Sequence, residues 1–248
     1  MINKFKFYII NLKQSNERKK NIINELNKQN ITNFQIIDAI DGNKLSEEEL
    51  ETFTFGNKKN FNTWGPKLTP SQIGCALSHI KIYKKFLKSN YEFAFILEDD
   101  AIFLRKFDTE LKNFIIRNLK YKKQIMLLSE LKEFLTKPLD NNQNYEIVNV
   151  TNAFYTHSYL INKEAAKSII NFNYPLKTVA DNFVFFKIYC GIKLTGLNPY
   201  ILDQDKKKFK TTIEMQQDYE KNFLFKRSIY KIKNKILKRF INFSGHKN

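Results

Sequence analysis

The stretch FKFYIINLKQSNERKKNIINELNKQNITNFQIIDAIDG, residues 5–42, decides the fold class of this chain. Its first apolar run, residues 5–12, is rich in aromatic and β-branched side chains and predicts a buried strand. Ser15 then precedes a segment with one apolar face, which is typical of a helix with a serine N-cap. Residues 33–42 predict a second strand that ends in an Asp-Gly turn. This strand–helix–strand order indicates an α/β protein.

The same alternation continues toward the C-terminus. In TPSQIGCALSHIKIYKKFLK, Thr69 is expected at the N-cap, Pro70 at the first helical position and Gln72 three residues after the cap, the pattern of a capping box. We therefore predict a buried helix over residues 70–88. Further strands are expected near residues 93–97, 124–129, 145–161 and 199–204. Helices are expected near residues 108–120 and 162–170, and residues 181–190 are expected to be either helical or extended. Strands alternating with helices predict an α/β sandwich around a mainly parallel sheet.

The composition is that of a basic globular chain. Of its 248 residues, 42% are hydrophobic, and the formal net charge is +17. This supplies enough apolar material for one good-sized core. The two cysteines, Cys75 and Cys190, show no CxxC spacing, so neither a disulfide framework nor a zinc site is indicated. No run approaches the about 18 apolar residues of a membrane span, and no secretory signal is indicated.

Three adjacent carboxylates follow an apolar run in FAFILEDDAIFL, residues 93–104: Glu98, Asp99 and Asp100. Ligands of open α/β sheets bind beyond the carboxyl ends of the strands, which is where these acids would lie. Adjacent carboxylates repel one another, and hard divalent cations such as Mg²⁺ or Mn²⁺ are their natural partners. The alternative is that the acids only close the strand and keep their charges in solvent.

Several segments of the chain occur together in a characteristic order. They are YIINLKQSNERK, IIDAIDG, LTPSQIGCALSHIKIYKKF and FILEDDA, followed by THSYLINKEAAKSII, PYILDQ and TTI. In this order and spacing they resemble glycosyltransferase family 25, the lipooligosaccharide galactosyltransferase type, over residues 5–213. The resemblance implies a GT-A type nucleotide-sugar-binding sandwich over residues 1–220 and an inverting transfer reaction.

The resemblance also assigns roles to the three carboxylates. It implies that Glu98 and Asp100, which share the i, i+2 spacing of an acidic-x-acidic motif, bind a divalent ion, Mn²⁺ or Mg²⁺, that bridges the phosphates of the donor. Asp99 would contact the donor sugar or ribose, or exchange roles with Glu98. The ion would stabilise the leaving nucleotide diphosphate as a Lewis acid.

An inverting transfer needs a base that accepts the proton of the acceptor hydroxyl. Asp181, in KTVADNF, is the candidate for this catalytic role, because it matches an acidic position of the family and begins an otherwise apolar segment. The alternative is that Asp181 is the N-cap of a helix that begins with NFVFFKIY.

The first strand and the turns after it are expected to face the nucleotide. By resemblance, Asn11 and Leu12 lie near base and ribose, and Asp38 and Asp41 are candidates for contacts with ribose or base. Turn chemistry is a competing explanation for Asp41. We interpret Arg18 as a solvated helix residue.

The capped helix contributes Ser78 and His79, which match the family's ALSH segment and are expected to line the donor site. The alternative for His79 is a hydrogen-bonded core histidine. Gly74 costs roughly 1 kcal/mol against alanine in a helix, so a close approach of backbone or ligand would explain it.

The segment DQDKKKFKTTI, residues 203–213, resembles the closing part of the family's domain. Gln204 and the hydroxyl of Thr211 are expected near the donor. The run Lys206–Lys208 is interpreted as a solvated charge cluster, with contact to a diphosphate as the alternative.

Residues 221–248 carry nine Lys or Arg and no Asp or Glu, with apolar residues at helical spacing. This pattern predicts a basic amphipathic helix on an anionic membrane surface. The alternatives are packing on the protein body or on a second subunit. Nucleic acid is an unlikely partner, because no aromatic-and-glycine recognition motif accompanies the basic residues.

These inferences combine into one functional hypothesis. The protein is expected to be a metal-dependent, inverting glycosyltransferase that moves a hexose, galactose from UDP-galactose, to a bacterial lipooligosaccharide or lipopolysaccharide acceptor. It would work in the cytoplasm, peripherally on the inner face of the cytoplasmic membrane, where a lipid-linked acceptor lies. The alternative is a basic binding protein for anionic lipid or nucleic acid without catalysis.

Overall fold

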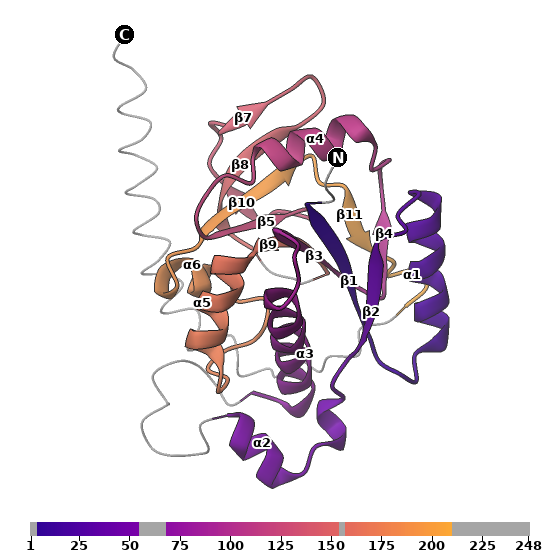
Figure 1. Ribbon diagram of the computed structural model, residues 1–248, viewed down its shortest axis with the longest axis vertical. Helices are drawn as coiled ribbons and strands as arrows, with labels where there is room; N and C mark the ends of the chain where they lie inside the picture. The colour runs from indigo at the N-terminus through magenta and orange to yellow at the C-terminus, as the bar shows by residue number, and fades with distance from the viewer. Residues whose placement is uncertain (1–3, 55–67, 154–156, 210–248) are drawn as a thin grey trace.

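The computed structural model describes residues 4–54, 68–153 and 157–209 of the chain. Strands and helices alternate through this part, as the sequence predicted (Figure 1). The elements in chain order are β1 (Phe5–Asn11), α1 (Asn16–Lys28), β2 (Phe34–Asp38), the 3₁₀ helix η1 (Gly42–Lys44), α2 (Glu47–Phe53), α3 (Pro70–Leu87), β3 (Phe93–Glu98), β4 (Ala101–Phe103), α4 (Thr109–Arg117), β5 (Gln124–Leu127), β6 (Glu133–Phe134), β7 (Asp140–Asn141), β8 (Glu146–Asn152), β9 (Ser158–Asn162), α5 (Lys163–Asn173), α6 (Phe183–Tyr189), β10 (Lys193–Asn198) and β11 (Leu202–Gln204).

The central sheet has the strand order β2-β1-β3-β9-β5-β10-β8-β6, and β7 also pairs with β8. The strand β1 pairs in parallel with β2 and β3, and β5 pairs in parallel with β10. Within this sheet only β8 and β9 run against the other described strands, since each pairs antiparallel with its neighbours. The predicted α/β sandwich with a mainly parallel sheet is therefore confirmed.

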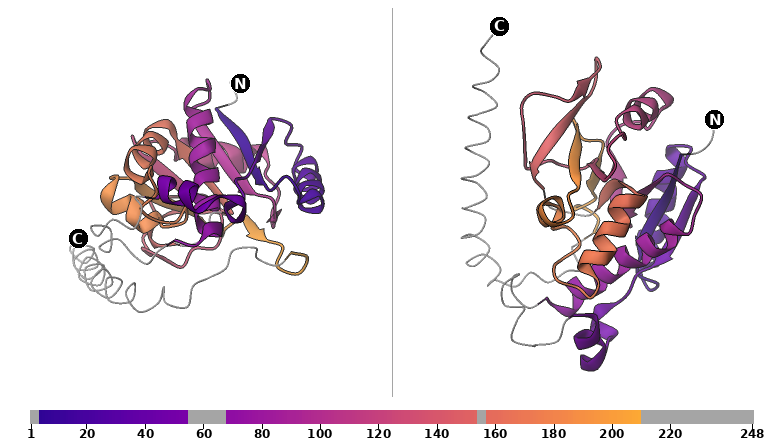
Figure 2. Two further views of the ribbon diagram at one scale, coloured as in Figure 1. Left: turned by 90° about the horizontal axis from the view of Figure 1, so that it is seen from below. Right: turned by 60° about the vertical axis from the view of Figure 1, so that its left-hand side comes forward.

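Helices cover both faces of the sheet (Figures 1 and 2). Because successive side chains of a strand point to opposite faces, β3 divides its apolar run between two cores. Ala94 and Ile96 pack in the core under α3, α5 and α6, while Phe93, Phe95 and Leu97 pack in the core under α1 and α4. A strand that is buried on both faces reads as a continuous apolar run, which is why FAFIL shows no alternation.

The helix α3 begins as the sequence predicted. The Thr69 side chain accepts a hydrogen bond from the Gln72 N–H, the Gln72 side chain accepts one from the Thr69 N–H, and Pro70 is the first helical residue. A Cβ on Gly74 would lie 2.5 Å from both the Gly42 nitrogen and the Ile40 carbonyl oxygen. A side chain at this position would therefore clash with neighbouring backbone. The glycine allows α3 to pack closely against η1.

Two smaller features complete the described fold. A two-stranded antiparallel sheet pairs β4 with β11, and it brings Gln204 opposite Ala101, next to the carboxylates. Among the described helices, none has the length and apolar content needed to cross a bilayer. The predicted amphipathic helix over residues 221–248 lies outside the described residues.

Candidate functional site

The strands β1, β2 and β3 end side by side at one edge of the sheet. Their register places Asn11 opposite Asp38, and Ile10 opposite Glu98. The three carboxylates therefore follow β3 at the carboxyl ends of neighbouring parallel strands, where ligands of α/β sheets bind. This position was predicted from the sequence.

A pocket of about 240 Å³ opens at this edge, bounded by the ends of β1 and β3, the start of α1, the segment around η1 and the first turns of α3. Its walls combine apolar side chains with polar and charged ones. Those that matter below are Leu12, Arg18, Asp41, Cys75, Ser78, Glu98 and Asp99. A concave site of this composition suits a small polar ligand with an apolar ring.

Asp99 and Asp100 share one cation. Nη1 of Arg18 donates hydrogen bonds to Oδ1 of Asp99 at 3.0 Å and to Oδ2 of Asp100 at 3.2 Å. The Nδ2 group of Asn11 donates to the other oxygen of Asp99 at 2.7 Å and to the Ser15 carbonyl at 3.1 Å. The carboxylates are thus held by the end of β1 and the first turn of α1.

The interpretation of Arg18 as a solvated residue is wrong. Its side chain is only 15% exposed, and its guanidinium lies 5.1 Å from the ring centre of Phe209. The sequence held a signal: Arg18 lies in the first turn of a helix, where the positive end of the helix dipole disfavours a cation unless an anion is nearby. The anions are Asp99 and Asp100.

The surroundings of Asp100 disfavour the charged form of its carboxyl. Burial is the main cause that raises the pKa of its carboxyl to about 7, Glu98 and Asp99 raise it further, and Arg18 opposes them. Its Oδ1 atom is buried without a hydrogen-bond partner in the described part of the chain. Oδ2 also accepts a long contact from the Gln204 side chain at 3.5 Å, while the expected contact of Gln204 with the donor stays a prediction. Burial likewise raises the pKa of Asp99, while Arg18 and Asn11 lower it.

This donor set fits a hard divalent cation. Asp99 and Asp100 offer carboxylate oxygens, the ligand type that Mg²⁺ and Mn²⁺ prefer, and the buried Oδ1 of Asp100 has unused acceptor capacity. The assignment of Glu98 with Asp100 as the ligand pair stays a prediction.

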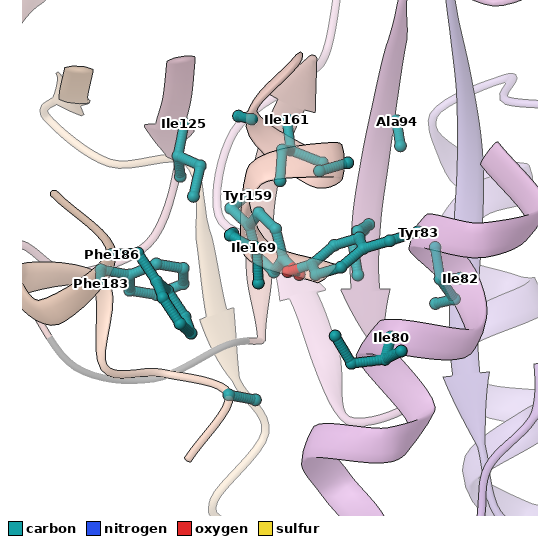
Figure 3. Close-up of a cluster of buried hydrophobic side chains, with 14 of the residues drawn as sticks. Ile80, Ile82, Tyr83, Ala94, Ile125, Tyr159, Ile161, Ile169, Phe183 and Phe186 are labelled. Carbon is teal, nitrogen blue, oxygen red and sulfur yellow. Dashed lines mark hydrogen bonds between the residues drawn. The ribbon is translucent and has the colours of Figure 1, made fainter. Parts of the chain in front are cut away.

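Glu98 faces a different set of groups from its two neighbours. Its Oε1 atom lies 3.8 Å from Nε2 of His79 on α3. The other ring nitrogen of His79, Nδ1, is hydrogen-bonded to the Tyr159 hydroxyl at 2.7 Å, and that hydroxyl lies 2.6 Å from the hydroxyl of Tyr83. Figure 3 shows the two tyrosines meeting at their hydroxyl oxygens within the core. His79 is therefore a buried, hydrogen-bonded histidine that also stands against a carboxylate of the site.

Ser78 and Leu12 both line the pocket, and their contacts with the donor stay predictions. The Ser78 hydroxyl also has a structural role, because it accepts from the Ile40 N–H at 2.8 Å and donates to the Gly74 carbonyl at 2.7 Å. Asp41 lines the pocket and caps η1 by accepting from the Asn43 N–H, so turn chemistry accounts for its position. Asp38 is exposed at the end of β2, beside the pocket rather than in its described lining.

Asp181 precedes α6 without capping it. Asn182 is the N-cap, and its side chain accepts from the Phe185 N–H at 3.3 Å, so the alternative role of Asp181 as the N-cap is wrong. The role of Asp181 as base stays a prediction. Thr211 lies outside the described residues.

His157 was not singled out in the sequence and lies at this site. Its carbonyl accepts from the Glu98 N–H at 3.1 Å, because β9 runs beside β3. Burial lowers the pKa of its imidazole, and Glu98 and Asp203 oppose that effect. The pairing of β9 with β3 joins segments that no local pattern connects, so periodicity and motifs do not reveal it.

The fold and the site together define an α/β protein with an acidic ligand site at the carboxyl edge of its sheet. Residues 4–184 match the family model of glycosyltransferase family 25, described as an LPS biosynthesis protein. The chain belongs to this family.

Named relatives agree with this membership. The chain is 30% identical over 205 residues to a Haemophilus influenzae protein named as a glycosyltransferase, covering 80% of this chain and 70% of that protein. It is 27% identical over 214 residues to the procollagen lysyl hydroxylase and glycosyltransferase of Acanthamoeba polyphaga mimivirus, and 24% identical over 173 residues to human procollagen galactosyltransferase 2. These cover 80% and 67% of this chain but only 23% and 27% of the relatives, so it spans about a quarter of their length.

A solved structure with a partial likeness is Staphylococcus aureus TarS 1–349. It aligns with a TM-score of 0.43 at 12% identity and covers 80% of this chain and 59% of that one.

Proposed function

We propose that this protein is a metal-dependent, inverting glycosyltransferase that transfers a hexose from a nucleotide sugar to a saccharide acceptor. The observation that carries the proposal is the buried pair Asp99 and Asp100, placed by β3 at the carboxyl edge of the sheet beside a pocket of about 240 Å³. Membership of glycosyltransferase family 25 supports the sugar-transfer reaction.

A divalent ion, Mn²⁺ or Mg²⁺, would be held by Glu98 and Asp100, with Asp99 beside them. When bound, such an ion supplies positive charge that stabilises a leaving diphosphate. Arg18 already places a guanidinium at this point, 3.0 Å from Asp99. A guanidinium pairs with phosphate oxygens as it does with carboxylates, so Arg18 is positioned to bind the donor's diphosphate.

The donor's nucleoside would occupy the pocket. Leu12 offers an apolar contact, and Ser78, Asp99 and Asn11 offer polar groups at or next to its walls. We propose that Asp38, His79, Gln204 and Thr211 make further contacts with the donor. Gln204 reaches the site through the pairing of β11 with β4.

The acceptor hydroxyl needs a base, and Asp181 is proposed for it. A carboxylate accepts such a proton when it is within hydrogen-bond reach, directly or through one water. Asp181 lies directly before Asn182, the N-cap of α6.

Galactose from UDP-galactose is the proposed donor sugar, and a lipooligosaccharide or lipopolysaccharide the proposed acceptor. The human relative is named as a galactosyltransferase, and the family model is described as an LPS biosynthesis protein. A lipid-linked acceptor agrees with the nine Lys or Arg of residues 221–248, which would bind an anionic membrane surface. We therefore place the protein in the cytoplasm, on the inner face of the membrane.

A donor screen tests the proposal. The full chain is incubated with a panel of UDP-sugars, a lipooligosaccharide acceptor and Mn²⁺, and released UDP is measured. We expect release with UDP-galactose above the other donors, and loss of release in Asp100→Asn. Absence of release with every donor, together with binding to anionic vesicles or nucleic acid, would favour the basic binding protein instead.

A further inference from the structure

Three side chains of different chemistry converge where α3 crosses the end of β3. The thiol of Cys75, a ring nitrogen of His79 and a carboxylate oxygen of Glu98 all lie within 4.8 Å of one another. Cys75 and His79 are four residues apart on α3, so they share one face of the helix. Sequence spacing alone did not indicate a metal site, because the third group comes from a strand.

The imidazole of His79 is aimed into this cluster by a fixed partner on its other side. The Tyr159 hydroxyl holds Nδ1 at 2.7 Å, and Tyr83 in turn holds the Tyr159 hydroxyl at 2.6 Å. Figure 3 shows both rings packed among apolar side chains, which fixes their positions. A hydrogen bond to the second ring nitrogen is the arrangement that orients metal-binding histidines.

The nitrogen that points toward the cluster lacks a hydrogen bond. Nε2 of His79 is buried, the residue is 1% exposed, and the atom has no hydrogen-bond partner within the described ranges. Its distance to Glu98, 3.8 Å, exceeds that of a hydrogen bond. A buried polar atom without a partner is costly, so a ligand at this position would remove an existing penalty.

The donor atoms select a class of ion. A thiolate sulfur, an imidazole nitrogen and one carboxylate oxygen are ligands of borderline cations such as Zn²⁺, whereas Mg²⁺ and Mn²⁺ prefer oxygen alone. Cys75 and Glu98 also line the pocket. A bound ion would therefore have three protein ligands and one position open to the pocket, which is the pattern of zinc sites that bind a substrate or water.

We propose that Cys75, His79 and Glu98 form a binding site for a borderline divalent cation, with Zn²⁺ as the type ion. The site shares Glu98 with the ion proposed for Glu98 and Asp100, but its thiolate and imidazole differ in chemistry from the carboxylates of Asp99 and Asp100, which contact Arg18. It does not rest on the proposed sugar transfer. Glu98 is the residue that both proposed ligand sets have in common.

Cobalt absorption spectroscopy tests the site directly. The full chain, stripped of metal, is titrated with Co²⁺, which reports a cysteine ligand through a thiolate-to-cobalt charge-transfer band in the near ultraviolet. We expect the band to saturate at one ion per chain and to disappear when Zn²⁺ is added. Absence of the band in the unaltered protein overturns the proposal.

The chain offers matched controls. Cys75→Ser should abolish the band, while Cys190→Ser should leave it unchanged, because the Cys190 thiol is buried elsewhere and donates to the Ser168 carbonyl. Asp100→Asn should also leave it unchanged, since that carboxylate belongs to the other set. A band that survives Cys75→Ser, or is lost in Cys190→Ser, overturns the assignment.

A measurement without a substitution covers the case in which Cys75→Ser fails to fold. Alkylation of the two cysteines is followed by mass spectrometry with and without Zn²⁺, and Zn²⁺ should protect Cys75 from the reagent. Unchanged alkylation of Cys75 at saturating Zn²⁺ contradicts the proposal.

The positioning role of Tyr159 has its own readout. Tyr159→Phe keeps the ring that packs 5.4 Å from Phe183 but removes the hydroxyl that holds His79. Loss of such an outer partner weakens metal binding by about 10–100-fold. Cobalt affinity equal to that of the unaltered protein would show that the tyrosine does not position the ligand.

Discussion

Arg18 and Asp99 form a hydrogen-bonded ion pair of 3.0 Å across 81 residues of sequence. Arg18 lies in the first turn of α1, which follows β1, and Asp99 follows β3, which pairs in parallel with β1. The same guanidinium reaches Asp100 at 3.2 Å. The site therefore contains its own positive charge. Of the three adjacent acids, Asp99 and Asp100 contact Arg18, whereas Glu98 lies near His79.

Arg18→Met should destabilise the protein and leave the fold unchanged. The substitution keeps most of the apolar stem and removes the cation from two carboxylates whose side chains are each only 10% exposed. We expect a loss of about 1–3 kcal/mol in the free energy of unfolding, measured by urea titration. Mn²⁺ should recover more stability in Arg18→Met than in the unaltered protein, because it replaces the missing charge.

Arg117→Met is the matched control for this prediction. Arg117 pairs with Asp140 at 2.9 Å, but its side chain is 55% exposed. Exposed ion pairs contribute about 0–1 kcal/mol, so this variant should lose little stability and gain none from Mn²⁺. Equal losses in the two arginine variants would show that the Arg18 contact is worth no more than a surface pair.

The pKa of Asp100, raised to about 7, gives a pH dependence with a definite sign. Between the unfolded pKa near 3.8 and about 7, the folded state holds a proton that the unfolded state has released. The free energy of unfolding that Asp100 contributes therefore falls as the pH rises through this window. Binding of Mn²⁺ requires the carboxylate, so its affinity should rise about tenfold per pH unit below 7 and level off above it.

Calorimetric titration with Mn²⁺ between pH 5.5 and about 8 measures this dependence. In Asp100→Asn the group no longer titrates, so the decline in unfolding free energy over the same range should become smaller. An Mn²⁺ affinity that stays flat across the range would contradict the assignment of Asp100 as a ligand.

The parts of the fold that were predictable are those encoded by neighbouring residues. The capping box of α3 and the apolar runs of β1 and β3 each lie within one segment, so periodicity and cap chemistry reveal them. The strand β10 was missed because Gly196 interrupts its apolar pattern. A Cβ there would lie 2.7 Å from the end of the Leu131 side chain, which would have to shift.

The candidate site divides in the same way. The position of the carboxylates at a strand end follows from the α/β pattern alone. The partners of Arg18 and the approach of His79 to Glu98 depend on how α1 and α3 cross the edge of the sheet, which no single segment specifies. The reversed direction of β9, which brings His157 to the site, is also invisible in an apolar run.

Gly74→Ala should destabilise the protein, although alanine is favoured over glycine in a helix by about 1 kcal/mol. The new Cβ would lie 2.5 Å from the Gly42 nitrogen and the Ile40 carbonyl oxygen, and both are backbone atoms that cannot move aside. We expect a loss of about 1–3 kcal/mol by urea unfolding, as for an overpacked core. UDP binding should weaken as well, because the displaced Ile40 segment lines the pocket.

Gly191→Ala separates crowding from backbone strain. A Cβ at Gly191 would have no neighbour within 4 Å, but the residue has a φ of 65°. Left-handed backbone costs an alanine about 1–2 kcal/mol, so stability should fall while UDP binding stays the same. Unchanged UDP binding in Gly74→Ala would argue against the packing of α3 on η1 as a determinant of pocket shape.

Asp181→Asn should lower turnover about 10²–10⁴-fold and leave UDP-sugar binding intact, as expected for loss of a general base. Its neighbour gives the structural control. Asn182→Ala removes the N-cap of α6 and should cost about 1 kcal/mol of stability with little change in turnover. Steady-state kinetics and urea unfolding of both variants measure the two effects. Turnover of Asp181→Asn equal to that of the unaltered protein would remove Asp181 as the base.

Deletion of residues 221–248 tests the membrane proposal. The segment carries nine Lys or Arg without an acid, and each basic residue near an anionic surface contributes about 1 kcal/mol. The shortened protein should no longer sediment with vesicles that contain phosphatidylglycerol, and binding of the full chain should weaken as salt is raised, because salt screens the attraction. Transfer to a soluble acceptor should persist in both proteins. If the shortened protein sediments equally well, the basic segment packs on the protein body or on a second subunit instead.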